Sequence, residues 1–255
     1  MINRKTTREI GFMREAGRIA AKARALAGEM VTVGTTTRSI NKAIHEFLKS
    51  HKAIPTFLGY RDFPASICIS VNEEVIHGIP SSRKLIQGDI VGIDIGATKN
   101  GFIGDCAATF IAGKGNPKSE KLVKITRECF YECLKYAKIG NRVSDISGAI
   151  QHHAESNGFS VVRAYSGHGV GTKLHEAPEV PNYIEKPRKG KDPRLVPGMT
   201  LAIEPMVNAG GADIKVLSDG WTVVTIDGTN SAHYENTILI TDGEPEILTL
   251  CEEMP

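Results

Sequence analysis

Two aspartates interrupt segments that are otherwise apolar. Asp94 lies inside an apolar run, and Asp105 follows on the other side of the dipeptide Asn100-Gly101. An Asn-Gly dipeptide between apolar segments predicts a β-hairpin with a two-residue turn, and this turn places Gly96 opposite Asp105. Asp94 then becomes a diagonal neighbour of Asp105 on the same face. Neighbouring carboxylates repel each other, so this arrangement favours a cation between them; a salt bridge or a turn cap is the alternative.

Three further candidate ligands lie in the second half of the chain. His168 stands among three glycines, which carry no side-chain bulk around its imidazole. Glu204 precedes Pro205, which favours an extended backbone at the glutamate. Glu235 precedes residues 236–240, which are expected to form a central strand. Any one of these could be a core histidine or a salt-bridged acid. Burying each charge costs several kcal/mol, however, so separate salt bridges do not explain all of them together.

A bound pair of divalent cations would account for all of these charged and polar residues in or beside apolar strands. Four carboxylates and one imidazole form an oxygen-rich donor set that can bridge two metals about 3.5–4 Å apart. Such a set suits Mn²⁺, Fe²⁺ or Co²⁺ at least as well as Zn²⁺. The sequence has no H-E-x-x-H motif, which excludes a zincin as the source of the site. The five candidate ligands are Asp94, Asp105, His168, Glu204 and Glu235.

Composition limits the class of protein. The chain has 255 residues, of which 41% are hydrophobic, so it can bury a sizeable core and is not disordered as a whole. Its net charge of +2 argues against a dedicated nucleic-acid binder. Five cysteines without a C-x-x-C pair indicate reduced thiols. No segment is apolar and long enough to be a signal peptide or a membrane span. We therefore expect a cytoplasmic protein without a membrane or DNA partner.

Apolar periodicity predicts the elements that position the candidate ligands. Strands are expected at residues 67–77 and, as the Asn100-Gly101 hairpin, at residues 88–112, with short strands and glycine-rich turns from residue 159 onward. Helices are expected at residues 7–30, 36–51, 117–137 and 143–157.

A weak internal repeat indicates how these elements are organised. Residues 34–50 align with residues 140–156, with five identities in seventeen positions, and both segments follow a helix and precede a β region. We therefore expect a duplicated unit covering roughly residues 7–112 and 117–250 within a single domain of residues 1–255. The predicted fold class is α+β, with helices on the outer face of a mainly antiparallel sheet.

Three segments resemble a known family. Residues 71–80 read VNEEVIHGIP, residues 165–171 read YSGHGVG and lead to His175, and residues 203–206 read IEPM. With them the chain resembles the type I methionine aminopeptidases over almost its whole length. The resemblance implies the pita-bread fold and metal-dependent removal of the initiator methionine from nascent proteins when the next residue is small. The sequence shows no Cys/His-rich N-terminal extension, so we expect the compact bacterial subtype, as a monomer.

The resemblance also implies residue roles. It assigns the five candidate ligands to two divalent ions (Co, Mn, Fe or Zn), with Asp105 and Glu235 as the bridging residues. His77 and His175 match two unligated active-site histidines, one near the scissile amide and one near the developing oxyanion. General chemistry adds two roles. Glu204 is placed to take the proton of the attacking water. His77 or His175 can donate a hydrogen bond to the tetrahedral oxyanion, and this bond strengthens only in the transition state.

The substrate methionine requires an apolar, polarisable pocket. Ordinary core packing is the alternative role for these side chains. By resemblance the pocket residues are Phe57, Tyr60, Phe63, Cys68 and Trp221.

Other positions depart from the family pattern or match it only weakly. Phe57 and Leu174 stand where relatives often carry other residues, so the shape of the pocket is expected to differ. Asn236 stands where histidine is common, and altered hydrogen bonding there would tune the metal affinity. Asn72 and Ser231 match a monovalent-cation site of relatives.

Three alternative functions compete with this hypothesis. Residues 94–98 also resemble the phosphate-loop hairpin of sugar kinases and actin-like ATPases, but a kinase leaves His168 and both glutamates without a role. A non-catalytic peptide-binding homologue should have lost metal ligands. A proline-specific aminopeptidase or prolidase shares the ligands, but usually has an additional N-terminal domain.

A basic loop suggests one further partner. Residues 185–194 contain five basic and two acidic residues. The segment from Lys186 to Arg194 could contact ribosomal RNA near the peptide exit, because a local basic patch is sufficient to attract phosphate. A solvated loop without a partner is the alternative.

Overall fold

The computed structural model describes residues 2–184 and 192–250 of the chain. Within them the four expected helices are confirmed, and their ends lie within three residues of the predicted ones. A short 3-10 helix, η1 (Tyr60–Asp62), lies between the second α-helix and the strands that follow it. The four α-helices are α1 (Thr7–Glu29), α2 (Thr37–Ser50), α3 (Pro117–Leu134) and α4 (Val143–Ser156).

Local sequence explains where three of these helices begin. Thr6 caps α1, and its side chain and that of Glu9 form a reciprocal capping box. Thr36 caps α2 through the backbone N–H of Ser39. Asn116 caps α3, whose first residue, a proline, needs no hydrogen-bond acceptor for its nitrogen.

The strands confirm the α+β class with antiparallel pairing. The central sheet has the order β1-β4-β5-β14-β9-β7-β8, with β2 on β4 and β15 on β14, and two smaller sheets have the orders β13-β10-β6 and β11-β12-β3. The strands are β1 (Ile54–Pro55), β2 (Cys68–Val71), β3 (Glu74–Ile76), β4 (Ile90–Lys99), β5 (Phe102–Ile111), β6 (Ser160–Val161), β7 (Ser166–Gly169), β8 (Glu176–Pro181), β9 (Thr200–Ile203), β10 (Met206–Asn208), β11 (Ile214–Val216), β12 (Val223–Thr225), β13 (Ser231–His233), β14 (Glu235–Leu239) and β15 (Glu246–Ile247).

The hairpin of β4 and β5 has the predicted register. Asn100 and Gly101 both have positive φ, 52° and 78°, as the tight two-residue turn requires. Gly96 pairs with Asp105, and Asp94 pairs with Ala107. The turn dipeptide thus sets the relation of the two aspartates.

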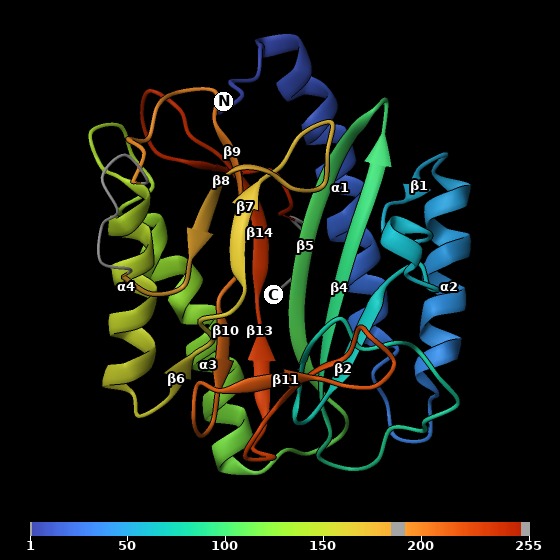
Figure 1. The fold of residues 1–255 in the computed structure, drawn as a ribbon. Coiled ribbons are helices and arrows are strands. Elements are labelled where there is room, and N and C mark those ends of the chain that lie inside the picture. The colour runs from blue at the N-terminus through green and yellow to red at the C-terminus, as the bar shows by residue number, and fades with distance from the viewer. Residues whose placement is uncertain (1, 185–191, 251–255) are drawn as a thin grey trace.

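Helices cover both halves of the central sheet (Figure 1). In the picture α1 runs behind β4 and β5 with α2 beside them, while α3 and α4 lie on the other side of the molecule. One apolar core joins α1 and α2 to β2 and β4, and another joins α3 and α4 to β9 and β14. At Gly104 a Cβ would lie 2.4 Å from the Cα of Gly17, so these two glycines allow α1 to approach β5 closely.

No helix in the described part of the chain is long and apolar enough to cross a membrane. The duplication of the 7–112 and 117–250 units stays a prediction, as does the single domain. The basic loop falls largely on residues 185–191, which lie outside the described residues.

Candidate metal centre and active site

The five candidate ligands come from five neighbouring segments of the central sheet. Its order β4-β5-β14-β9-β7 brings one ligand from each strand or strand end to one place. Asp94 lies on β4 and Asp105 on β5, and Glu235 begins β14 opposite Ala107 of β5. Glu204 directly follows β9. Residues distant in the sequence therefore form one cluster because their strands are neighbours.

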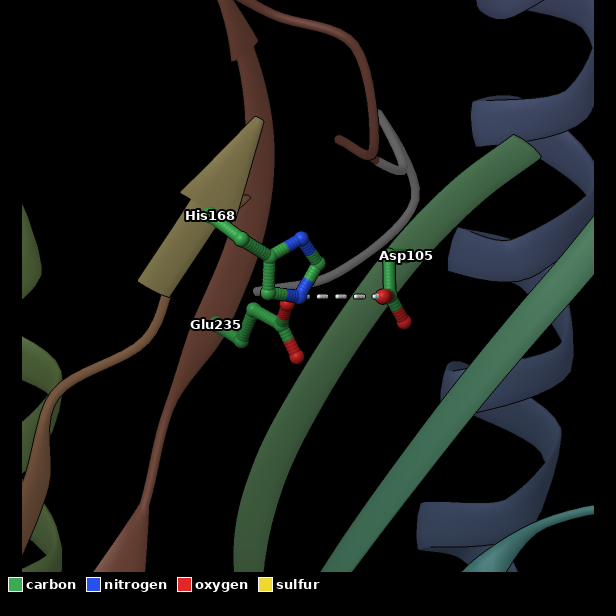
Figure 2. Close-up of side chains that lie close together, drawn as sticks. All are labelled: Asp105, His168 and Glu235. Atoms are coloured by element: carbon green, nitrogen blue, oxygen red, sulfur yellow. Dashed lines mark ion pairs between the residues drawn. The ribbon is translucent and has the colours of Figure 1, made fainter. Parts of the chain in front are cut away.

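The distances between these side chains show how tight the cluster is. His168 Nε2 lies 3.4 Å from Glu204 Oε1 and 3.9 Å from Asp105 Oδ2. Figure 2 shows the side chains of Asp105, His168 and Glu235 converging on one point, and ligand atoms of these three lie within 4.8 Å of one another. Asp94 and Glu204 line the same cavity. The structure thus brings all five predicted ligands together.

The acids of this cluster are buried, and burial shifts their pKa values upward. Burial raises the pKa of Asp94 to about 7. Burial and then the neighbouring Asp94 raise the pKa of Asp105 well above its usual range. Burial also raises the pKa of Glu204 and Glu235, with the other acids adding to the effect. Among the described residues only histidines, and no lysine or arginine, lie within ion-pair distance of these acids.

Several oxygens of the cluster are available as ligands. Asp94 Oδ1, Asp105 Oδ1 and Glu235 Oε1 are buried and accept no hydrogen bond from the described residues. Buried polar atoms of this kind normally have a partner. A divalent cation would provide one for all three, so the donor set fits the predicted metal ions.

The imidazole of His168 is prepared to act as a ligand. Its Nδ1 lies 3.0 Å from the carbonyl oxygen of Gly169. A carbonyl only accepts, so Nδ1 carries the proton and Nε2 presents its lone pair to the acids. Burial lowers the pKa of His168 to about 3, which keeps the ring neutral.

The glycines around His168 make space for neighbouring groups. At Gly167 a Cβ would lie 2.5 Å from the carbonyl oxygen of Ala202, and at Gly169 one would lie 2.4 Å from that of Ala177. These glycines therefore allow the strands beside β7 to approach closely.

His77 and His175 lie at the same cavity as the cluster. His175 Nδ1 lies 2.8 Å from the hydroxyl oxygen of Tyr60, and its ring stands 4.3 Å from that of His168 between centroids. His77 packs edge-on against Trp221 at 6.0 Å. Burial lowers the pKa of His77 to about 4, and burial followed by Arg61 lowers that of His175. Both rings are therefore neutral near pH 7.

The five predicted pocket residues line this cavity, whose volume is about 330 Å³. Phe63 and Trp221 meet edge to face at 5.0 Å. The departures Phe57 and Leu174 are both buried in its wall. At Gly96 a Cβ would lie 2.7 Å from the Phe57 ring, so the glycine makes room for that ring. The cavity joins an apolar compartment to the acidic cluster.

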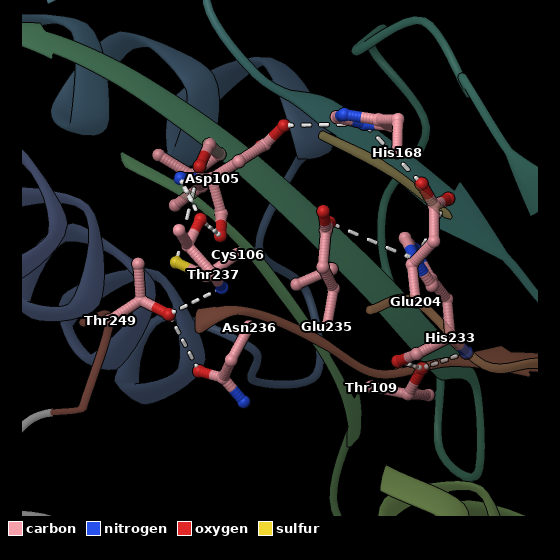
Figure 3. Close-up of polar contacts among 12 residues, drawn as sticks. Asp105, Cys106, Thr109, His168, Glu204, His233, Glu235, Asn236, Thr237 and Thr249 are labelled. Atoms are coloured by element: carbon pink, nitrogen blue, oxygen red, sulfur yellow. Dashed lines mark hydrogen bonds and ion pairs between the residues drawn. The ribbon is translucent and has the colours of Figure 1, made fainter. Parts of the chain in front are cut away.

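One residue of the centre was not predicted. His233, at the end of β13, is 4% exposed, and its Nε2 lies 3.8 Å from Glu204 Oε2 and 3.9 Å from Glu235 Oε2 (Figure 3). Within the described part of the chain this nitrogen has no hydrogen-bond partner. Burial lowers its pKa to about 3. The sequence could have indicated His233 through its distance of two positions from Glu235, because residues two apart in an extended chain lie on the same face.

Asn236, where the family often has histidine, belongs to a buried network that includes Arg24. Arg24 is 2% exposed and donates to the Glu235 carbonyl oxygen at 2.8 Å and to Asn236 Oδ1 at 3.0 Å. Thr249 Oγ1 also donates to Asn236 Oδ1, at 2.9 Å (Figure 3). This network fixes the backbone at Glu235 without touching its carboxylate.

The two residues of the predicted monovalent-cation site are neighbours. The Ser231 N–H donates to the Asn72 carbonyl oxygen at 2.8 Å. The Asn72 side chain donates to Asp89 Oδ1 at 2.8 Å and accepts from the N–H of Ile90 at 3.0 Å. The cation itself stays a prediction.

Comparison with known proteins agrees with this geometry. The model of metallopeptidase family M24 matches residues 11–242. A methionine aminopeptidase of Clostridium acetobutylicum is 50% identical over 99% of this chain and 100% of its own length. Methionine aminopeptidase 1 of Bacillus subtilis is 52% identical over 98% of this chain and 99% of its own.

Solved structures give the same result. A methionine aminopeptidase of Thermotoga maritima superposes with a TM-score of 0.94 at 44% identity, covering 98% of this chain and 99% of its own. A prolidase of Pyrococcus furiosus superposes with a TM-score of 0.77 at 25% identity, covering 98% of this chain but 66% of the prolidase. The pita-bread fold is confirmed, and the full-length match decides against the kinase alternative. The chain therefore belongs to metallopeptidase family M24, among its bacterial type I methionine aminopeptidases.

Proposed function

We propose that this chain removes the N-terminal methionine from nascent proteins and peptides whose second residue is small, with two divalent metal ions. One observation carries the proposal. Five neighbouring strand segments place one ligand each in a buried cluster without a lysine or arginine partner among the described residues, and this cluster opens on an aromatic cavity. That cavity suits a methionine side chain.

The five candidate ligands would hold the two ions, with Asp105 and Glu235 as bridges. When bound, the ions polarise the scissile carbonyl and lower the pKa of the attacking water. Glu204 accepts the proton of that water and passes it to the leaving amine. Its buried position raises its pKa, which suits a group that must hold a proton between the two steps.

The two neutral histidines act on the substrate. The Tyr60 hydroxyl engages one ring nitrogen of His175 and leaves the other for the substrate carbonyl oxygen, which becomes an oxyanion in the transition state. His77 is fixed against Trp221 at the wall of the cavity and contacts the scissile amide. The apolar part of the cavity, with Phe57, Cys68 and Trp221, binds the methionine side chain.

The proposal also covers the identity of the ions, the place of action and the partners. Co²⁺, Mn²⁺, Fe²⁺ or Zn²⁺ would serve as the ions, and Asn72 and Ser231 would hold a monovalent cation. The protein would act in the cytoplasm as a monomer, and the basic loop from Lys186 to Arg194 would contact the ribosome.

Peptide hydrolysis tests the proposed function. Chelated enzyme is supplied with each of the four metals and given Met-Ala-Ser or, as a control, an Ala-Pro peptide. We expect metal-dependent release of methionine from Met-Ala-Ser alone, because the cavity accepts a long apolar side chain. Cleavage of only the proline peptide would assign the chain to the proline-specific members of the family. No cleavage of either would favour a peptide-binding homologue.

Metal binding should strengthen as the pH rises from about 5 to about 8, with release of protons. The protons come from the carboxyl groups, because Asp94 has a pKa of about 7 and the other three acids have raised values. His168 has a pKa of about 3 and is already neutral. Calorimetry of Mn²⁺ binding in two buffers with different ionisation enthalpies counts the protons. An affinity that does not change with pH would contradict this account.

The metal-free protein should show the opposite trend in stability. A raised carboxyl pKa stabilises the fold at pH values below the unfolded pKa of about 4, and this contribution is lost as the pH rises through the folded pKa. Above pH about 7.5 nearly all of the histidines are neutral in both states, so the acids determine the slope. The melting temperature of the metal-free protein should therefore fall from pH about 7.5 to about 8.5, and added Mn²⁺ should reverse this fall.

A further inference from the structure

The N-terminal segment forms a buried ion pair with the loop that carries His175. Lys5 Nζ lies 2.6 Å from Glu176 Oε2, and the two side chains are only 2% and 10% exposed. Taking two charges out of water costs several kcal/mol, and breaking such a pair leaves one buried charge alone. A buried ion pair of this kind therefore contributes little to the stability of the fold by itself, which suggests that it has another role.

Both partners are fixed by further contacts. The Lys5 N–H donates to the Gly198 carbonyl oxygen at 2.7 Å. Glu176 Oε1 accepts from the N–H of Lys173 at 3.2 Å. At Gly171 a Cβ would lie 2.5 Å from Glu176 Oε1 and 2.5 Å from Lys5 Cε. The third glycine after Ser166 in the YSGHGVG segment thus leaves space for the ion pair.

The pair lies between the segments of two active-site histidines. Glu176 is the first residue of β8 and directly follows His175. The strand partner of Glu176 is Gly169, which directly follows His168. The register of the two strands shifts between His168 and Gly169. Residues 171–175 belong to no helix or strand. Among the described residues, the only hydrogen-bond partner of the His175 side chain is the Tyr60 hydroxyl. The position of His175 therefore depends on the residues that fix the ends of this loop.

We propose that Lys5 and Glu176 are positioning residues for methionine removal: their ion pair fixes the 171–176 loop so that the His175 imidazole meets the reacting carbonyl. The proposal rests on the role of His175 in the proposed function. Neither Lys5 nor Glu176 lines the cavity, so they act through His175 and not on the substrate. A small displacement of a positioned group is enough to slow a reaction strongly.

Two variants test the pair. Lys5→Met keeps the length of the side chain and removes its charge, and Glu176→Gln keeps the shape and removes the other charge. Each should lower kcat for Met-Ala-Ser by about 10-fold or more with little change in KM, and Lys5→Arg should recover part of the loss. Arg4→Met is the matched control. Arg4 is exposed and donates to the Pro197 carbonyl oxygen at 2.8 Å, in the same turn that Lys5 contacts, and its loss should leave kcat unchanged.

A double substitution separates positioning from simple structural support. In a His175→Ala background, Lys5→Met or Glu176→Gln should cause no further loss of kcat, because the group that they position is absent. Hydrogen exchange should become faster at residues 171–176 in Lys5→Met and not in Arg4→Met. Mn²⁺ affinity should stay close to that of the unchanged protein.

The outcomes distinguish this proposal from the function on which it rests. Unchanged kcat in both single variants would overturn the positioning role, and so would an equal loss in the presence and absence of His175. If Lys5→Met does not fold, Glu176→Gln alone decides by the same comparison. If the unsubstituted protein releases no methionine, the proposed function fails. The positioning claim would then be tested separately by hydrogen exchange: equal exchange rates at residues 171–176 in Lys5→Met and in the unsubstituted protein would overturn it.

Discussion

His175→Ala should retain both metal ions and lose most of its turnover, with kcat lower by about 10²–10³-fold. The His175 ring lies at the cavity beside the acidic cluster, and one of its nitrogens faces the Tyr60 hydroxyl at 2.8 Å. No ion pair joins it to a carboxylate among the described residues. Its hydrogen bond to the substrate strengthens only as the oxyanion forms, so kcat falls more than binding does.

Kinetics on Met-Ala-Ser and calorimetry with Mn²⁺ measure the two parts of this prediction separately. His152→Ala is a suitable control, because His152 is exposed on α4, outside the cavity. Turnover equal to that of the unchanged protein would remove His175 from the mechanism. Loss of the metal ions would instead make His175 part of their binding site.

Asp105→Asn should abolish the metal pair and lower kcat/KM by at least about 10³-fold. Asp105 is 3% exposed and lies with His168 and Glu235 in the tightest part of the cluster. An amide has the same shape but carries no charge and offers only one ligand oxygen. It therefore cannot bridge two cations as a carboxylate does.

The same substitution should not destabilise the metal-free protein. Burial and the neighbouring Asp94 raise the pKa of Asp105, so its charged form is unfavourable when no cation is bound. At pH 8 the metal-free Asp105→Asn protein should melt at the same temperature as the unchanged protein or higher, while the stabilisation by Mn²⁺ should be lost. Asp62→Asn, at an exposed position of η1, is the control for loss of one negative charge. Two bound ions in Asp105→Asn would contradict the bridging role.

Local sequence was sufficient to predict the helices, the β4–β5 hairpin and the placement of two metal ligands, Asp94 and Asp105. The Asn100-Gly101 turn has a single compatible register, and this register places Asp94 and Asp105 on the same face. Helix caps such as Thr6 and Asn116 mark where helices begin. These features depend on residues close together in the chain, so periodicity and turn chemistry can predict them.

Contacts between distant segments could not be predicted in this way. The Lys5–Glu176 pair joins residues 171 positions apart, and Arg24 reaches a carbonyl 211 positions away. Such contacts depend on which strands become neighbours, and nothing in the spacing of single residues specifies that. His233 stands two residues from Glu235, which indicates a shared face, but its place beside Glu204 follows from the pairing of β13 with β10.

We expect five side chains, one from each of five neighbouring strand segments, to hold two metal ions for this hydrolysis. Anomalous diffraction from crystals grown with Mn²⁺ tests it most directly. We expect two manganese peaks within the cluster, both in contact with Asp105 and Glu235, and the remaining contacts supplied by Asp94, His168 and Glu204. No manganese peak at the cluster, or a single ion bound by other residues, would contradict the account.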